Sequence, residues 1–129
     1  MSESFIELLS LSLPCDTTAP GQARHELDKL ASIDPVRQAA MLIASELVSN
    51  AVLHSGCEEH DQIEVCARLA DNLLEISVHD PGLSRSEPEV PAGRAIGGLG
   101  LAIIEKLAYR WGIHQPDGRR VWAQLLLIA

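Results

Sequence analysis

Glu46, Asn50 and His54 are the residues of this sequence whose types and spacing are best suited to chemistry. They lie four positions apart, so on a helix each side chain is displaced by only about 40° from the one before. The resulting polar stripe would offer a carboxylate that can accept a proton and an amide oxygen that can bind a cation. Apolar Ile43 and Leu47 flank Glu46, so a buried carboxylate there would need a polar partner or a cleft. A stripe that merely reaches solvent and does no chemistry is the alternative, and the helix alone leaves both open.

Two further polar clusters lie where predicted elements begin or end. Asp80-Pro81-Gly82 follows a predicted strand; its carboxylate can accept a hydrogen bond from a ligand amine, and its glycine lets a flat ring approach the backbone. Asp-Pro-Gly is also a common turn. Gly97-Gly98-Leu99-Gly100 precedes an apolar helix, where free backbone amides suit a phosphate group. This glycine cluster lacks the Gly-Lys-Ser/Thr of a Walker A loop, and it follows a loop rather than the strand of a Rossmann fingerprint.

The periodicity of apolar residues predicts the elements that must position these clusters. Alternation predicts strands at residues 5–13, 63–69, 74–78, 110–114 and 121–128, with a short hairpin turn at 71–72. Helical patterns cover residues 20–30 and 101–109, and a third helix is capped by Asp34, opened by Pro35 and closed near Gly56. Residues 83–95 lack any periodicity and form a loop long enough to be a functional lid. Without internal repeats or a linker, residues 1–129 are expected to form one domain.

Composition excludes several classes of partner. The net charge of -8 argues against non-specific binding to nucleic acid, and there is no polybasic signal for a membrane surface. No apolar run approaches the ~20 residues of a membrane span, and no secretory signal is recognisable, so a cytoplasmic location is expected. Aromatic residues make up only 3%, so the core must be aliphatic. The three cysteines, Cys15, Cys57 and Cys66, are odd in number and irregular in spacing, so reduced thiols are expected.

In their order along the chain, the three polar clusters together resemble the GHKL ATPase superfamily. The shared pattern is Glu46-x-x-x-Asn50 on a helix, then Asp80-x-Gly82 after a strand, then Gly98-x-Gly100-Leu101 opening a helix. Within this superfamily, the sequence is most similar to the anti-sigma-factor serine/threonine kinases of bacteria. The similarity lies in residues 45–54 and 98–104 and in the closing segment Gly118-Arg119-Arg120-Val121. The resemblance covers about residues 14–128. It implies the Bergerat fold, an α/β two-layer sandwich with a mixed, mainly antiparallel sheet and helices on one face.

The resemblance also implies roles for the helix and strand residues. Asn50 would hold Mg²⁺ through its side-chain oxygen, and Glu46 would be the general base that takes a proton from a serine or threonine hydroxyl. His54 would contact phosphate, although a structural role at the helix end is an equal alternative. Asp80 would accept a hydrogen bond from the adenine amino group, and Gly82 would give the base room.

The glycine cluster and the loop before it would surround the phosphates. Gly98, Leu99, Gly100 and Leu101 would bind ATP at the start of the helix, with backbone amides directed at the phosphates. Residues 83–96 would be the ATP lid, in which Arg94 is a better candidate than Arg85 for a γ-phosphate contact. An arginine simply solvated in a loop is the default alternative.

Two departures and one misleading motif qualify the resemblance. Arg119 stands where relatives often carry threonine, so a small hydroxyl contact to the nucleotide is missing, and the lid is short for the superfamily. Arg24-His25-Glu26-Leu27 looks like the phospho-accepting histidine box of sensor kinases. It lies only 25 residues before Asn50, which leaves no room for the dimerisation domain that separates the two in those kinases.

The function that the resemblance implies is that of an ATP- and Mg²⁺-binding anti-sigma factor. It would phosphorylate a serine or threonine of an anti-anti-sigma (STAS-type) antagonist and would bind a sigma factor. The alternative is a non-catalytic, ATP-binding partner-switching module that regulates transcription by protein–protein binding. A detached catalytic domain of a histidine kinase is a third reading, which the absence of an acceptor domain disfavours. Relatives in this family suggest a homodimer.

Overall fold

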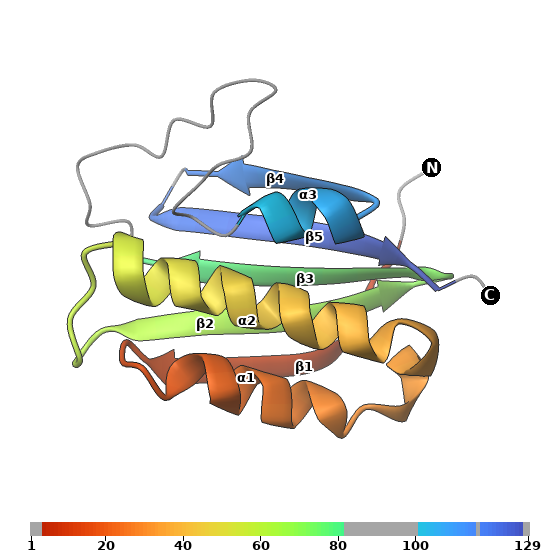
Figure 1. Cartoon of the computed structure of the whole chain (residues 1–129), viewed down its shortest axis with the longest axis horizontal. Helices are drawn as coiled ribbons and strands as arrows, with labels where there is room; N and C mark the ends of the chain where they lie inside the picture. Colours follow the sequence, from red (N-terminus) through yellow and green to blue (C-terminus); the bar gives the residue numbers. More distant parts are fainter. Residues whose placement is uncertain (1–3, 82–100, 116, 128–129) are drawn as a thin grey trace.

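The computed structural model describes residues 4–81, 101–115 and 117–127. Its elements, in chain order, are β1 (Ile6–Pro14), α1 (Ala19–Asp28), the 3-10 helix η1 (Ala31–Val36), α2 (Arg37–His54), β2 (Gln62–Ala70), β3 (Leu73–Asp80), α3 (Leu101–Leu107), β4 (Arg110–His114) and β5 (Arg119–Leu126) (Figure 1). Every strand and helix predicted from periodicity is present, with ends that shift by a few residues.

Five strands form one sheet in the order β1-β2-β3-β5-β4. Each of the four neighbouring pairs is antiparallel. The expected sandwich is therefore confirmed, but the parallel component of a mixed sheet does not occur among the described residues. The reason is the placement of β5, which lies between β3 and β4 and is antiparallel to both.

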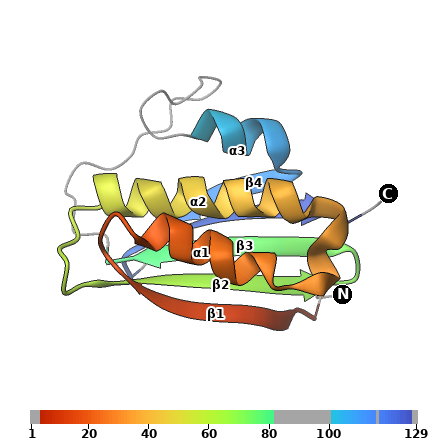
Figure 2. The same ribbon diagram turned by 60° about the horizontal axis from the view of Figure 1, so that its bottom comes forward.

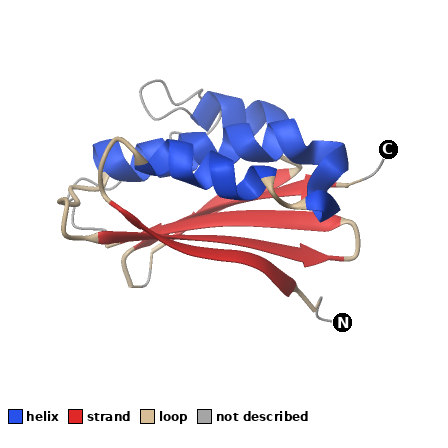
Figure 3. Ribbon diagram, turned by 90° about the horizontal axis from the view of Figure 1, so that it is seen from below, coloured by secondary structure: helices blue, strands red, loops and turns tan. Residues whose placement is uncertain are grey.

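The helices that the structure describes all lie on one face of this sheet (Figure 3). α1 and α2 lie side by side over the sheet, and α3 packs against α2 and β4 (Figures 1 and 2). α2 is apolar nearly all round because it contacts both neighbouring helices as well as the sheet beneath it. The buried core between the two layers is aliphatic, as the scarcity of aromatic residues predicted; its largest side chains include Leu27, Ile33, Ile43, Leu47, Ile63, Leu74, Ile76 and Ile104.

The opposite face of the sheet carries polar residues in place of helices. A row of hydrogen bonds crosses four strands: Arg68 to Glu75 at 2.6 Å, Gln124 to Glu75 at 3.3 Å, and Arg110 to Gln124 at 2.8 Å. These long side chains cover one another, so Glu75 and Gln124 are buried although no helix covers them. The row accounts for charged residues in strands that are otherwise apolar.

The start of α2 differs from the prediction. Asp34 and Pro35 lie within η1, and α2 begins only at Arg37, because Val36 has a non-helical backbone. The Asp34 carboxylate does not cap the helix, since it is paired with the Arg37 guanidinium. The predicted end of the helix is correct, because Gly56 adopts the left-handed conformation with φ of 79°.

The expectation of three reduced thiols is wrong for two of them. Cys15, just after β1, and Cys57, just after α2, form a disulfide with 6.2 Å between their Cα atoms. The two are 42 residues apart in sequence, but β1 and α2 end at the same end of the molecule (Figure 1). Cys66 is the free cysteine. Spacing could not reveal this pairing, because it depends on where two elements of different layers finish.

None of the helices within residues 4–81, 101–115 and 117–127 has the length and apolar character needed to cross a membrane.

Candidate functional site

The three residues of the polar stripe on α2 differ in burial, and the middle one is the most buried. Glu46 is half-buried, Asn50 is only 8% exposed, and His54 is exposed at the last position of the helix. α2 places these three on one line, as the spacing predicted. The structure separates their environments, however, because Asn50 lines a cavity whose described lining includes neither Glu46 nor His54.

Five elements enclose that cavity: α2, β3, α3, β4 and β5. Its polar lining residues are Asn50, Asp80 and Arg119, and its apolar walls are Leu47, Val78, Leu101, Ile113 and Val121. Apolar walls with a few convergent polar groups are typical of a small-molecule site. The cavity volume is about 10 Å³, which is room for about one water molecule.

Asp80 and Arg119 form a buried ion pair at the edge of this cavity. They face one another across the β3–β5 pairing, and both Nε and Nη2 of Arg119 lie 3.2 Å from Oδ2 of Asp80. Their side chains are 2% and 9% exposed. The carboxylate predicted to meet a ligand amine is therefore already bonded to a guanidinium.

Gly118 makes this pairing sterically possible. Its backbone has φ of +92°, and a Cβ at this position would overlap the carbonyl oxygen of Asp80. Glycine alone allows the turn before β5 to approach the end of β3 so closely. From the sequence alone, Arg119 is only a missing hydroxyl contact; the register that makes it the partner of Asp80 is visible only in the folded sheet.

Glu46 lies one turn before Asn50 but outside the cavity lining. The Glu46 carboxylate is less desolvated than its apolar neighbours suggest, because the side chain is only half-buried and Leu42, one turn earlier on the helix, is 42% exposed. No described side chain forms a hydrogen bond or ion pair with Glu46, so its carboxylate stays available to a ligand or partner. The same holds for the side-chain amide of Asn50 within the described part of the chain.

Several predicted site residues lie outside the described residues. These are Gly82, Arg85, Arg94, Gly98, Leu99 and Gly100, together with the predicted lid at 83–96. Leu101 is described: it opens α3 and forms part of the cavity wall.

The motif at residues 24–27 has a structural role on α1. Arg24 bonds the hydroxyl oxygen of Ser45 at 2.6 Å and so ties α1 to α2. His25 is exposed and lies beside a groove between β1 and α1, away from the cavity of Asn50 and Asp80.

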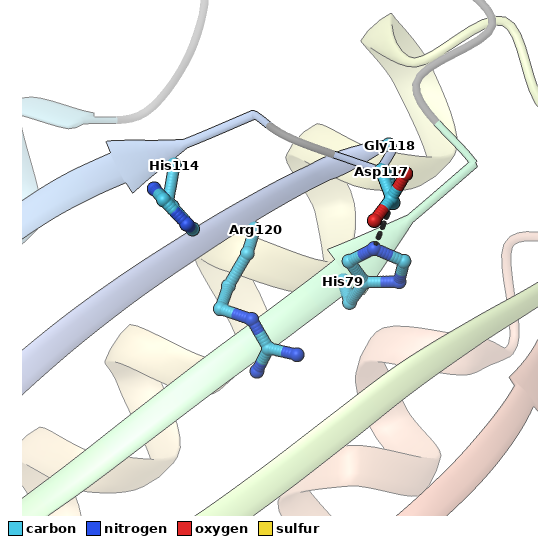
Figure 4. Close-up of a pocket in the computed structure, with 5 residues that line it drawn as sticks. All are labelled: His79, His114, Asp117, Gly118 and Arg120. Atoms are coloured by element: carbon cyan, nitrogen blue, oxygen red, sulfur yellow. Dashed lines mark hydrogen bonds between the residues drawn. The ribbon is translucent and has the colours of Figure 1, made fainter.

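A second pocket, of about 230 Å³, lies on the uncovered face of the sheet (Figure 4). It is lined by His79, His114, Asp117, Gly118 and Arg120. Nε2 of His79 lies 2.6 Å from the backbone oxygen of Asp117 and is hydrogen-bonded to it. Arg120 donates to the hydroxyl oxygen of Ser77 at 3.2 Å. Successive residues of β5, Arg119 and Arg120, thus point to opposite faces of the sheet.

Comparison with known proteins agrees with this geometry. Residues 14–125 match the family model described as the histidine kinase-like ATPase domain. The solved structure of the RsbU and RsbW domains of Rv1364c from Mycobacterium tuberculosis is similar, with a TM-score of 0.69 and 25% sequence identity over 92% of this chain. The chain spans 31% of the length of that protein chain. No curated protein matches the sequence.

Proposed function

Because the chain belongs to the histidine kinase-like ATPase domain family, we propose that it binds ATP with Mg²⁺ and phosphorylates a serine or threonine of a partner protein. The nucleotide would enter between α2, β3, α3, β4 and β5. The observation that carries the proposal is the cavity itself, in which Asn50 and Asp80 meet apolar walls from five elements. The likeness to a structure that contains an RsbW domain supports the kinase branch of the family.

The donor set around Asn50 is suited to Mg²⁺ held mainly by phosphates. Mg²⁺ takes one or two protein oxygens and fills its other positions with phosphate oxygens and water. The side-chain oxygen of Asn50 supplies one such ligand from a position that is 8% exposed. The described residues contain no cluster of three or more histidine, cysteine or acidic side chains able to hold a metal by themselves. Bound Mg²⁺ would neutralise phosphate charge.

Glu46 would act as the base of the transfer. Its carboxylate accepts the proton of the attacking serine or threonine hydroxyl. The hydroxyl oxygen forms a bond to the γ-phosphorus, and the bond from that phosphorus to the bridging oxygen of ADP breaks. The carboxylate is half-buried and has no ion-pair partner among the described side chains. It can therefore approach a partner protein that docks against this part of α2.

The proposed partners follow from the resemblance to anti-sigma factors. They are a sigma factor and an anti-anti-sigma protein of the STAS type. The chain would act as one ATPase domain, form a homodimer and bind these partners in the cytoplasm. A net charge of -8 supports protein partners over nucleic acid or an anionic membrane surface.

A non-catalytic, ATP-binding partner-switching module is the second candidate. The observation that favours it is the buried Asp80–Arg119 pair, which occupies the polar edge of the cavity. A site that rarely admits a nucleotide would suit a module that senses ATP. Such a module would bind its partners without transferring phosphate to them.

The test of the proposed function is calorimetric titration with ATP and Mg²⁺, followed by transfer of labelled phosphate to a candidate antagonist. Asn50→Ala is expected to abolish the Mg²⁺-dependent part of ATP binding. Glu46→Gln is expected to retain ATP binding and to lose phosphate transfer, while Glu59→Gln, an exposed loop carboxylate, serves as the matched control. Binding that is indifferent to Asn50→Ala would contradict the site. Binding without transfer to any antagonist would favour the non-catalytic module.

A further inference from the structure

The disulfide fastens the part of the helical layer that carries the polar stripe. Cys15 precedes α1 and Cys57 follows α2, so the loop that their bond closes contains α1, η1 and the whole of α2. Glu46 and Asn50 both lie inside this loop. The distance of 6.2 Å between the two Cα atoms is usual for a disulfide, for which about 4.4–6.8 Å is typical. The fold therefore brings the two thiols together without rearrangement.

The folded chain does not depend on this bond. A chain of 129 residues is long enough to be stabilised by an aliphatic core, whereas the domains that need disulfides are much shorter. Inside the closed loop, four large apolar side chains are fully buried: Leu27, Ile33, Ile43 and Leu47. Sγ of Cys57 also lies 3.4 Å from the carbonyl oxygen of Ala51, so a released thiol has an acceptor in place. The bond can therefore open and form again in the folded state.

The two cysteines differ in how far solvent reaches them. Cys15 is 6% exposed, whereas Cys57 is half-buried and lies in a loop between the exposed residues Gly56 and Glu58. Thiol–disulfide exchange begins when a thiolate reaches one sulfur of the bond and displaces the other. Sγ of Cys57 is therefore the sulfur that an external thiolate attacks, and Cys15 is the leaving group.

The surroundings of the disulfide are acidic. Four carboxylates follow the two cysteines within a few positions: Asp16, Glu58, Glu59 and Asp61. The backbone amide of Glu58 donates to Oδ2 of Asp61 at 2.8 Å, which holds that carboxylate against the turn after Cys57. His60 lies 3.6 Å from Glu58 and 3.8 Å from Asp61, but it offsets their charge only when it is protonated. Residues 14–18 and 54–62 contain no lysine or arginine, so the turn repels anions.

We propose that Cys57 is a site of reversible thiol–disulfide exchange, and that the acidic turn selects neutral or cationic low-molecular-weight thiols over anionic ones. The thiolate of the reagent forms a bond to Sγ of Cys57. The bond between the two protein sulfurs breaks, and its electron pair passes to Sγ of Cys15, which takes up a proton. The proposal goes beyond the proposed function, because it involves no nucleotide.

A second molecule of the thiol completes the exchange. Its thiolate attacks the reagent's sulfur in the mixed disulfide, and Cys57 leaves as a thiolate that takes up a proton. Two electrons thus reduce the protein disulfide, while two molecules of thiol are oxidised to one small disulfide. The reverse steps, with the small disulfide as the oxidant, form the protein bond again.

The test compares three small thiols on the oxidised chain: cysteamine, which carries an ammonium group, neutral 2-mercaptoethanol, and anionic 2-mercaptoethanesulfonate. Each rate is taken per thiolate and divided by the rate of the same thiol with the neutral disulfide of 2-mercaptoethanol, which removes differences in nucleophilicity. Cys66→Ser serves as the background, because Cys66 is the other cysteine. If Cys66→Ser does not fold, the wild type serves, with Cys66 mapped separately.

Two further measurements accompany the rates. Acid quenching, alkylation and peptide mass spectrometry identify which cysteine carries the reagent. Circular dichroism in the far and near ultraviolet compares the fold of the oxidised and the reduced chain.

The reagent is expected on Cys57, with the alkyl group on Cys15. The corrected rate for cysteamine should exceed that for the sulfonate about tenfold at low ionic strength. In 1 M salt the difference should shrink to about twofold, because the Debye length falls to about 3 Å. The double variant Glu58→Gln/Glu59→Gln should narrow it in the same way. Asp71→Asn is the matched control, because Asp71 is an exposed carboxylate just beyond the opposite end of β2, and it should leave the rates unchanged.

Several results would overturn the proposal. A reagent found mainly on Cys15 would show that the wrong sulfur is assigned. Loss of the circular dichroism of the folded state on reduction, or a bond that only denaturant opens, would show that the disulfide is structural. Equal corrected rates for the three thiols, or a difference that the double variant leaves intact, would remove the selection by the acidic turn. Failure to bind ATP would contradict the proposed function alone, because nucleotide takes no part in these measurements.

Discussion

The buried Asp80–Arg119 pair predicts a large stability effect from the removal of a single charge. Asp80→Asn keeps the shape of the side chain but leaves the guanidinium of Arg119, 9% exposed, without its counter-charge. Breaking a buried pair from one side typically costs about 3–5 kcal/mol, because the remaining ion stays desolvated and unpaired.

The geometry supports a magnitude in this range. Two unit charges 3.2 Å apart attract by about 5 kcal/mol at an effective dielectric constant of about 20. The desolvation of both ions offsets much of this attraction in the wild type, but after Asp80→Asn only the penalty on Arg119 remains. A domain of this size is stable by about 5–15 kcal/mol, so the variant should fold but unfold at a temperature lower by about 10–20 °C.

Urea unfolding without nucleotide measures this effect in Asp80→Asn, in Arg119→Met and in the double variant. The double variant should be more stable than the sum of the single changes implies by about 2 kcal/mol, because it leaves no unpaired ion behind. Lys29→Met is the matched control. Nζ of Lys29 lies 3.0 Å from Oε2 of Glu26, but the two side chains are 58% and 34% exposed. The free energy of unfolding should therefore fall by less than about 1 kcal/mol.

A loss in the free energy of unfolding that is no larger for Asp80→Asn than for Lys29→Met would refute this prediction. The pair would then be open to water and would not close the cavity. A double variant whose loss equals the sum of the single losses would refute it equally, because the two charges would not be coupled.

Three further predictions concern other parts of the molecule. Cys57→Ser should lower the free energy of unfolding by about 4 kcal/mol, since the disulfide to Cys15 closes a loop across 42 residues, and reduction of the wild type followed by urea unfolding should give the same loss. Gly118→Ala should cost more than about 1 kcal/mol in thermal unfolding, because its φ of +92° and the adjacent carbonyl oxygen leave no place for a Cβ; a wild-type melting temperature would contradict this. Burial and, secondly, the negative charge of Glu7 raise the pKa of the Cys66 thiol, so it stays protonated at neutral pH. Its alkylation should therefore be slow at pH 7 and accelerate only at clearly alkaline pH, with Glu7→Gln shifting that rise to lower pH; fast alkylation at pH 7 would refute the shift.

The sequence by itself determined the elements and the polar stripe. Alternation placed all five strands, and helical periodicity placed α1, α2 and α3, because these patterns record which side of an element is buried. The four-residue spacing of Glu46 and Asn50 put both on one line of α2, since helical geometry is local. The family resemblance then supplied the fold, which the antiparallel sheet with helices on one face confirms.

Only the tertiary structure decided which distant residues meet. Asp80 and Arg119 are 39 residues apart and face each other through the register of β3 and β5, while Cys15 and Cys57 meet because two layers end at the same place. Local patterns carry no information about such pairs, because register and layer packing depend on every side chain in the core. The stripe on α2 was thus predictable from the sequence, whereas the closed cavity in front of Asn50 was not.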